Sequence, residues 1–248
     1  MNAKMAVFAT ILLAACSQSD APSDKVEQAA HEVVSAVEGD PAQPAAGPYA
    51  PRNDCAELPE AAGFMQALNR AIAARDVEAL VVLAADDIKL GSGEGGGTAE
   101  LRQRLDDEDG ALWKELDSLV ELGCARNSQG GITLPWFFEQ PIPGDRAKGF
   151  VVTGVDVPLY DAPAKDAPVL ARLSWDAVEP WSGGPEERAP EQEGFQHVIV
   201  PENGIEPGEV RPPTGYVTRD RLRSMIGYRL TAASRNGRWR IISLLSGS

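Results

Sequence analysis

The sequence predicts an α+β protein in which a mainly helical domain precedes a domain of short strands that ends in a β-hairpin. From residue 54 to about residue 122, apolar side chains recur every three or four positions, as they do in helices that bury one face. Beyond Pro141-Ile142-Pro143-Gly144 the apolar residues tend to alternate with polar ones, which is typical of strands. Near the end of the chain, Asn236-Gly237 separates two alternating runs, and this dipeptide is the strongest short signal of a hairpin.

The start of the chain has the pattern of an export signal. Lys4 supplies one positive charge, and residues 6–15 form an apolar or small run. That run is too short for the roughly 20 apolar residues that cross a bilayer. It ends in Leu13-Ala14-Ala15-Cys16, with small residues directly before a cysteine. We therefore expect residues 1–15 to be a signal peptide that is removed.

Leu13-Ala14-Ala15-Cys16 resembles the lipobox of bacterial lipoproteins. The resemblance implies that the Cys16 thiol carries diacylglycerol, that cleavage occurs just before Cys16, and that the new amino terminus is acylated, for example with palmitate. Several acyl chains anchor a protein stably, whereas one gives marginal binding. Ser17 stands where an aspartate favours retention in the inner membrane, so the resemblance implies the outer membrane, with the protein facing the periplasm. The alternative is an ordinary secretory signal that happens to contain a cysteine.

Residues 16–53 are expected to be a disordered tether between the lipid and the folded domains. The segment is rich in Ala, Ser, Glu and Asp, and its prolines interrupt any periodic pattern. His31 lies in this segment, and a lone histidine there is given no role as a ligand.

Cys55 and Cys124 are predicted to form a disulfide. The chain has three cysteines, and assigning Cys16 to lipid leaves this pair. An oxidising envelope favours their pairing. The bond closes a loop of roughly 70 residues and stabilises the fold by about 4 kcal/mol if its geometry is unstrained. The alternative is a reactive thiol, but no CxxC motif and no histidine between the two cysteines supports redox or nucleophilic chemistry.

Residues 54–144 are expected to form the mainly helical domain. The periodic apolar groups predict four helices, at about residues 64–73, 77–83, from residue 98 onward, and 110–122. Asp76 is the expected N-cap of the second helix and Thr98 that of the third.

The glycine-rich segment 91–97 is expected to be a flexible connection. A phosphate-binding loop needs Gly-Lys-Ser/Thr after the glycines. Here Gly97 is followed by Thr98-Ala99-Glu100, and Glu94 lies inside the loop, so no cation is available to bind an anion.

Three short segments of the helical domain carry a resemblance. They are Phe64-Met65-Gln66-Ala67-Leu68, Arg75-Asp76-Val77-Glu78-Ala79-Leu80 and Asp86-Asp87-Ile88-Lys89-Leu90. Over residues 64–108 this pattern is similar to the opening of nuclear transport factor 2-like proteins. In that family the first helices lead into a curved sheet around a pocket, so the resemblance implies a pocket. Too few strands precede Pro141 to complete such a sheet, and no catalytic residue is carried over.

Residues 145–248 are expected to form the β domain, and three of its segments also carry a resemblance. They are Val157-Pro158-Leu159-Tyr160, Val169-Leu170-Ala171-Arg172-Leu173 and Gly215-Tyr216-Val217. Over about residues 150–223 they resemble the bacterial SH3-like domain, which implies a small barrel that binds peptidoglycan or a protein partner. A proline-rich loop insertion is expected at about residues 179–213, and His197 within it is expected to be a strand residue rather than a ligand.

Four aromatic residues of the β domain are candidate members of a ligand groove: Tyr160, Trp175, Trp181 and Tyr216. Aromatic side chains suit binding surfaces because they combine a large apolar face with, in Tyr and Trp, a polar tip. The alternative is that each of them packs in the core.

The last 34 residues are basic although the whole chain has a net charge of −14. Over residues 215–248 seven arginines oppose one acid, Asp220. In the predicted hairpin Trp239 faces the core, while Arg238 and Arg240 face outward. The arginines either meet an anionic wall polymer or lipid head groups, or give the outward strand positions solubilising charge, which is the interpretation we favour.

Composition and motifs predict a binding protein rather than an enzyme. The negative charge argues against nucleic acid as a partner, because phosphate binding needs clustered Lys and Arg. The chain has two histidines and no HExxH motif, so neither a metal site nor a cofactor is expected. We expect a non-catalytic, membrane-anchored envelope lipoprotein that binds peptidoglycan or a protein. The alternatives are a small-molecule pocket of the nuclear transport factor 2-like type and a structural assembly factor.

Overall fold

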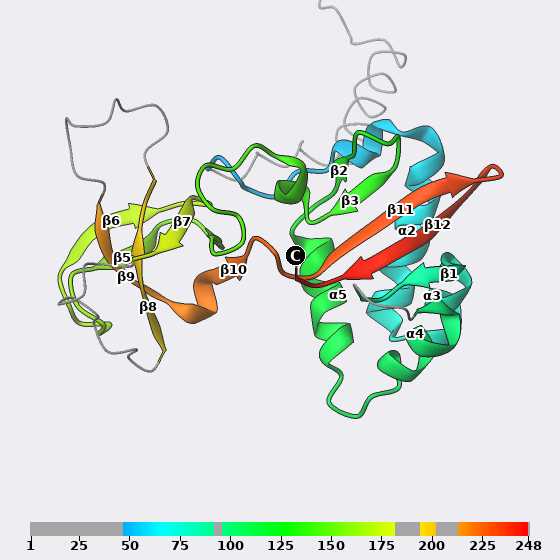
Figure 1. The fold of residues 1–248 in the computed structure, drawn as a ribbon, viewed down its shortest axis with the longest axis horizontal. Coiled ribbons are helices and arrows are strands. Elements are labelled where there is room, and N and C mark those ends of the chain that lie inside the picture. Colours follow the sequence, from blue (N-terminus) through cyan, green and yellow to red (C-terminus); the bar gives the residue numbers. More distant parts are fainter. Residues whose placement is uncertain (1–46, 92–95, 182–193, 202–212, 248) are drawn as a thin grey trace, which may run out of the picture. The chain divides into compact units, whose positions relative to one another are not determined.

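The fold is known from a computed structural model, which describes residues 47–91, 96–181, 194–201 and 213–247 (Figure 1). The predicted signal peptide, Cys16 and His31 lie outside these ranges. Four α-helices and two β-sheets make up the described chain, so the predicted α+β class is confirmed.

The helices and strands are as follows. The α-helices are α2 (Pro59–Ala74), α3 (Val77–Leu83), α4 (Gly97–Leu105) and α5 (Ala111–Glu121), and the 3-10 helices are η1 (Asp54–Glu57), η2 (Trp136–Glu139) and η3 (Arg219–Arg221). The strands are β1 (Ala84–Lys89), β2 (Ala125–Arg126), β3 (Ile132–Leu134), β4 (Phe150–Val152), β5 (Val157–Tyr160), β6 (Val169–Leu173), β7 (Ala177–Pro180), β8 (Phe195–Ile199), β9 (Thr214–Thr218), β10 (Leu222–Ser224), β11 (Arg229–Arg235) and β12 (Arg238–Leu245).

Residues 47–53, expected to belong to the disordered tether, are packed against the rest of the chain. Tyr49 and Ala50 are buried, and the backbone N–H of Tyr49 donates to the carbonyl of Trp175 at 3.1 Å. The prolines correctly predict the lack of a helix or strand here. A segment without a helix or strand can still pack against the rest of the protein, so the prolines do not predict that the segment is disordered.

The four predicted helices are present, and one of the two predicted caps is correct. Asp76 caps α3, since its Oδ1 accepts the backbone N–H of Ala79 at 2.9 Å. Thr98 is not the N-cap of α4, because that helix begins one residue earlier, after Gly96. Gly96 has a φ of 133°, and a side chain there would collide with the carbonyl of Ile88. The close approach of the two backbones therefore sets where α4 starts.

The first sheet has the strand order β1-β12-β11-β3-β2. β1 runs parallel to β12, and the other neighbours are antiparallel. Helices α2, α3, α4 and α5 share one apolar core with this sheet. Its most deeply buried side chains are Leu68, Leu80, Ile88, Leu101, Leu116, Leu119, Ile132, Leu134 and Leu230.

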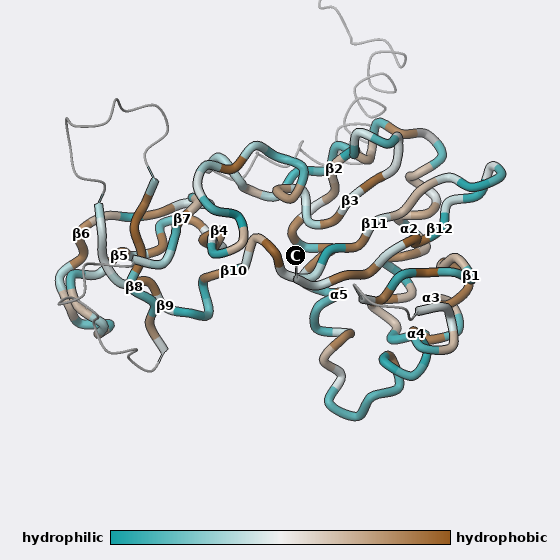
Figure 2. Tube along the Cα trace, viewed as in Figure 1, coloured by the Kyte–Doolittle hydropathy of each residue, from teal (hydrophilic) through white to brown (hydrophobic). Residues whose placement is uncertain are grey.

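The C-terminal hairpin belongs to this first sheet and not to the β domain of residues 145–248 in which it was expected. Leu230 of β11 lies opposite Leu134 of β3, and Ile241 of β12 lies opposite Ala84 of β1. Alternation predicts which side of a strand is buried but not which strand lies beside it. Figure 2 shows hydrophobic residues along the hairpin strands and hydrophilic residues at their turn. The hairpin thus provides the strands that the helical domain lacked before Pro141.

The second sheet has the order β10-β4-β7-β8-β9-β5-β6, with antiparallel neighbours throughout. It has its own core, made of Val152, Val157, Leu159, Leu173, Val178, Val198 and Val217. Over the described residues β10 and β6 are its two edges, so the closed SH3-like barrel that was expected is not seen. Periodicity predicts strands, whereas closure depends on which edges meet. β8 lies inside the predicted loop insertion 179–213 and joins β7 to β9.

A third group of buried residues connects the two sheets. Its members are Tyr49, Leu122, Ala125, Trp136, Phe137, Ile142, Val151, Ala177 and Met225. Beside it, a guanidinium nitrogen of Arg223 in β10 and a carboxylate oxygen of Glu115 in α5 form an ion pair at 2.8 Å, and the Arg223 side chain is 16% exposed. The β domain is therefore held to the helical part by packing as well as by the chain itself.

Candidate functional site

A line of four aromatic residues crosses the second sheet. Tyr160 of β5 lies opposite Tyr216 of β9, which lies opposite His197 of β8. The backbone N–H of Trp181, directly after β7, donates to the carbonyl of His197 at 3.0 Å. We call Trp181, His197, Tyr216 and Tyr160 the aromatic row. Because residues paired across strands share a face, the four side chains lie on the same side of the sheet.

The aromatic row lies on the side of the sheet that faces away from the apolar core. Leu159, Val198 and Val217, which neighbour members of the row in sequence, are all fully buried on the opposite side. All four residues of the row are themselves only partly buried. Alternation along each strand therefore separates a closed apolar face from an accessible aromatic one.

The rings of the row are in contact with one another and with one neighbour. His197 and Tyr216 stack at 4.4 Å between ring centroids with an interplanar angle of 9°. Trp181 meets His197 at 6.2 Å and 62°, and Tyr160 meets the buried Phe195 at 6.0 Å and 82°. Such edge-to-face and stacked pairs are favourable and hold the rings in place. The row is a preformed surface, because its members already fix one another's orientation.

Three of the four predicted groove residues lie in the aromatic row, and Trp175 does not. Trp175 is in the turn between β6 and β7, where its backbone has a left-handed φ of 54°. Its N–H donates to the carbonyl of Gly154 at 3.0 Å, and its side chain packs against the buried group that connects the sheets. Trp175 is thus a packing residue of this turn.

His197 is the member of the row that sequence reasoning did not include. The expectation that His197 is a strand residue is confirmed, since it lies in β8, where Phe195 and His197 share one face. The strand pairing that sets His197 against Tyr216 is not visible in the sequence, because no short turn joins β8 to β9 to fix their register.

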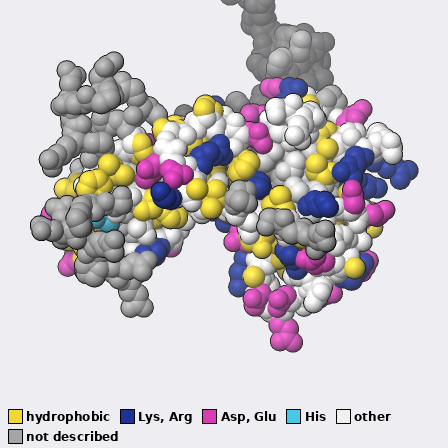
Figure 3. All heavy atoms as spheres, viewed as in Figure 1, with side chains coloured by type: hydrophobic (Ala, Val, Ile, Leu, Met, Phe, Trp, Pro, Cys, Tyr) yellow, Lys and Arg dark blue, Asp and Glu magenta, His cyan; other side chains and the backbone are white. Residues whose placement is uncertain are grey.

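The acidic run Asp106-Asp107-Glu108-Asp109 forms an exposed turn between α4 and α5. Figure 3 shows acidic side chains gathered at this end of the molecule. Across the described ranges, no group of three or more His, Cys, Asp or Glu residues is arranged to hold a metal ion. The same ranges contain no helix with the length and apolar character needed to span a bilayer. The run is a solvated turn, since all four of its side chains are exposed.

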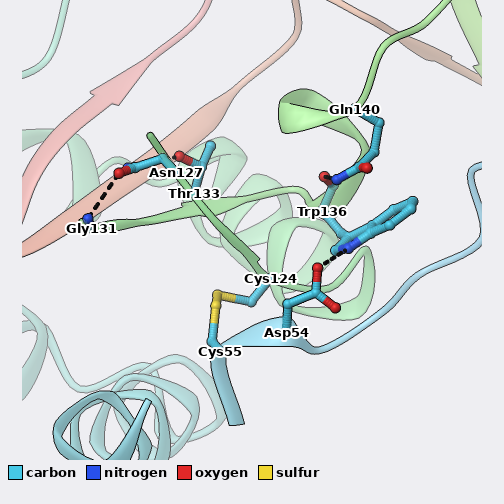
Figure 4. The surroundings of a disulfide bond; sticks show 8 residues. All are labelled: Asp54, Cys55, Cys124, Asn127, Gly131, Thr133, Trp136 and Gln140. Atoms are coloured by element: carbon cyan, nitrogen blue, oxygen red, sulfur yellow. Dashed lines mark hydrogen bonds between the residues drawn. A yellow bond between two sulfur atoms is a disulfide. The ribbon is translucent and has the colours of Figure 1, made fainter. Parts of the chain in front are cut away.

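The predicted disulfide between Cys55 and Cys124 is confirmed. It joins η1 to the residue before β2, with a Cα–Cα distance of 5.7 Å, and both cysteines are buried. Backbone hydrogen bonds flank it, from Cys124 N to Arg52 O at 2.8 Å and from Asp54 N to Cys124 O at 2.9 Å. Asp54 also accepts the indole N–H of Trp136 at 2.7 Å (Figure 4). The disulfide thus lies within a hydrogen-bonded junction, and neither of its sulfurs is a free thiol.

Among the cavities lined by described residues, two on the helical part stand out. One of about 520 Å³ lies between α2 and α3 and is lined by four alanines, by Val82 and Leu83, and by the charged residues Arg70, Asp76 and Glu78. The other, of about 690 Å³, lies between β1 and the turn of the β11–β12 hairpin. Neither lies between the helices and the first sheet, where the resemblance to nuclear transport factor 2-like proteins would place a pocket. Buried core side chains occupy that space.

No model of a protein family matches the sequence, and a search of curated proteins finds no significant relative. A function for this chain is therefore inferred from its own residues and their arrangement.

Proposed function

We propose that the protein is an exported lipoprotein of the cell envelope that binds peptidoglycan through the aromatic row and catalyses no reaction. In this proposal lipid on Cys16 anchors it to the outer membrane, and the segment before residue 47 serves as the spacer to the folded part. The observation that carries the binding function is the row itself, in which four ring-bearing side chains are accessible on one sheet face.

The aromatic row has the chemistry and the spacing to meet a sugar chain. Neighbouring strands lie about 4.8 Å apart, so a row over four strands spans about 14 Å. An extended glycan can therefore lie along the row and contact more than one of its side chains. Trp181 is inclined to its neighbour and can offer a ring face to the C–H face of a sugar. His197 and Tyr216, stacked on each other, present ring edges and polar atoms to hydroxyl and acetamido groups.

The disulfide supports the proposed compartment. Disulfides persist in oxidising environments such as the periplasm and are rare in the cytosol. The bond between Cys55 and Cys124 is buried, as a structural disulfide is. The predicted export signal before Cys16 and the disulfide in the folded part are consistent with one another, because each is typical of proteins located outside the cytoplasm.

Lipidation is tested by metabolic labelling of cells with a palmitate analogue. The wild-type chain is expected to carry the label and to sediment with membranes, whereas the Cys16→Ser variant is expected to lose both properties. Cys55→Ser is the matched control, since it removes a different cysteine and leaves the label on Cys16. A Cys16→Ser variant that is still labelled and membrane-bound would refute the anchor.

Peptidoglycan binding is tested by sedimentation with purified sacculi at low salt, using the full chain with Cys16→Ser so that no lipid contributes. We expect Trp181→Ala and Tyr216→Ala each to weaken binding at least fivefold, because truncating an aromatic contact residue costs about 1 kcal/mol or more. Leu170→Ala on β6 is the control, since Leu170 is 52% exposed on the same sheet but lies outside the row.

The result for the unsubstituted row decides the proposal. If this chain stays in the supernatant at low salt, peptidoglycan is not its ligand. Binding of a protein partner is then the function to test. If it sediments but Leu170→Ala weakens binding as strongly as Trp181→Ala, the aromatic row is not the binding site. Circular dichroism of each variant separates loss of binding from loss of fold.

A further inference from the structure

Three arginines lie side by side at the end of the β11–β12 hairpin. Arg235 lies directly opposite Arg238, and Ala233 lies directly opposite Arg240. Paired residues share a face, and so do residues two apart on one strand, so Arg235, Arg238 and Arg240 project from the same face. This face is the reverse of the one that buries Ile241. Figure 3 shows Lys and Arg side chains gathered at this end of the sheet.

This arrangement opposes like charges in a chain that has acidic residues in excess. Like charges directly across a strand pair are destabilising, yet Arg235 and Arg238 occupy such a pair. In the described part of the chain, Asp87 is the one carboxylate that forms an ion pair with these three guanidinium groups, to Arg235 at 2.7 Å. Arg240 donates to the carbonyl of Trp239 at 3.1 Å. Solubility does not require this cluster, because the chain carries 23 basic and 37 acidic residues.

The cluster borders the cavity of about 690 Å³. Its lining residues are Ala84, Ala85, Asp86 and Asp87 from β1 and Arg235, Asn236, Arg238 and Arg240 from the hairpin. The lining therefore has three positive and two negative charges, with the guanidinium groups on the hairpin side. The small side chains of Ala84 and Ala85 leave the space between the two walls open.

We propose that this cavity binds a phosphate-bearing anion, with Arg238 and Arg240 as its main ligands and Arg235 shared between the anion and Asp87. The planar fork of arginine donors matches phosphate oxygens in geometry and charge. A bound anion also offsets the repulsion between Arg235 and Arg238. This site lies on the first sheet, apart from the aromatic row, and does not depend on the function proposed for that row.

The site is tested by calorimetric titration of the full chain, carrying Cys16→Ser, with inorganic pyrophosphate at low salt. We expect Arg238→Gln and Arg240→Gln each to weaken binding about fivefold, as for one partly exposed charged contact. Asp87→Asn is expected to tighten binding, because it removes a competing carboxylate from Arg235. Arg221→Gln is the matched control, since Arg221 is exposed, belongs to the same basic tail and lies outside the cavity.

Vesicle binding distinguishes the two sources of such a phosphate. Flotation of the same proteins is compared on vesicles of phosphatidylcholine alone and with phosphatidylglycerol. Vesicle binding that requires phosphatidylglycerol, Arg238 and Arg240 supports a site for lipid head groups. Pyrophosphate binding without vesicle binding supports a site for soluble phosphates. The proposal is overturned if neither probe binds, if Arg221→Gln weakens binding as much as Arg238→Gln, or if Asp87→Asn weakens it.

Discussion

Removing the disulfide by the double substitution Cys55→Ala and Cys124→Ala is expected to lower the free energy of unfolding by about 4 kcal/mol, since the bond closes a loop of roughly 70 residues. For a folded part of this size, this corresponds to a fall in the melting temperature of roughly 8–16 °C. The physical reason is that the open loop gains conformational freedom mainly in the unfolded chain. Thermal unfolding followed by circular dichroism, with and without the two substitutions, measures the effect.

The native junction is expected to survive this substitution at low temperature. The hydrogen bonds between Cys124 and Arg52, and between Trp136 and Asp54, do not involve the sulfur atoms. A reductant is expected to lower the melting temperature of the wild-type chain to that of the double variant and to leave the variant unchanged. Equal melting temperatures for the oxidised wild type and the variant would show that the bond contributes no stability.

The substitution Leu230→Ala is expected to lower the free energy of unfolding by about 2–5 kcal/mol. Leu230 is 1% exposed and packs in the core shared by α2–α5 and the first sheet, so its loss leaves a cavity there. The helical circular dichroism signal and the hairpin are expected to be lost together, because they belong to one core. Urea unfolding monitored at 222 nm gives the change.

Leu170→Ala is the matched control for this experiment. It makes the same chemical change on β6, where the side chain is 52% exposed, and is expected to alter stability by less than about 0.5 kcal/mol. If Leu230→Ala had an equally small effect, the hairpin would not be part of the helical core, and its assignment to the first sheet would be incorrect.

The local parts of this fold could be predicted from the sequence, and the pairing of strands could not. The helices follow from apolar spacing, and the cap at Asp76 follows from its side chain, because both are short-range effects. β1 gave no strand signal, since Asp86 and Asp87 are poor strand formers. It forms because β12 offers backbone partners and Ile88 packs in the core. The hairpin itself was correctly predicted, but its neighbours come from segments about 100 or more residues earlier.

For the candidate site too, the sequence shows which residues are aromatic but not which of them lie side by side. Tyr160, Trp181 and Tyr216 were predicted as members of a ligand groove, and the strand register explains why they share one face of the sheet. Trp175 has the same chemistry, but its backbone is left-handed and its partly buried side chain packs against the buried group that connects the sheets. His197 was expected to be a strand residue rather than a ligand, and it lies in β8. Its place in the row comes entirely from its strand partner.

The interior position of β12 in the first sheet affects the order in which the protein can fold. β12 is the last of the described strands in sequence, yet it lies between β1 and β11, so the first sheet is not complete until residue 245 has been synthesised. Until then the helices have no complete surface on which to bury their apolar faces, and their pairing must wait for contacts of long sequence separation. The helical part can therefore complete its folding only after β12 has been made.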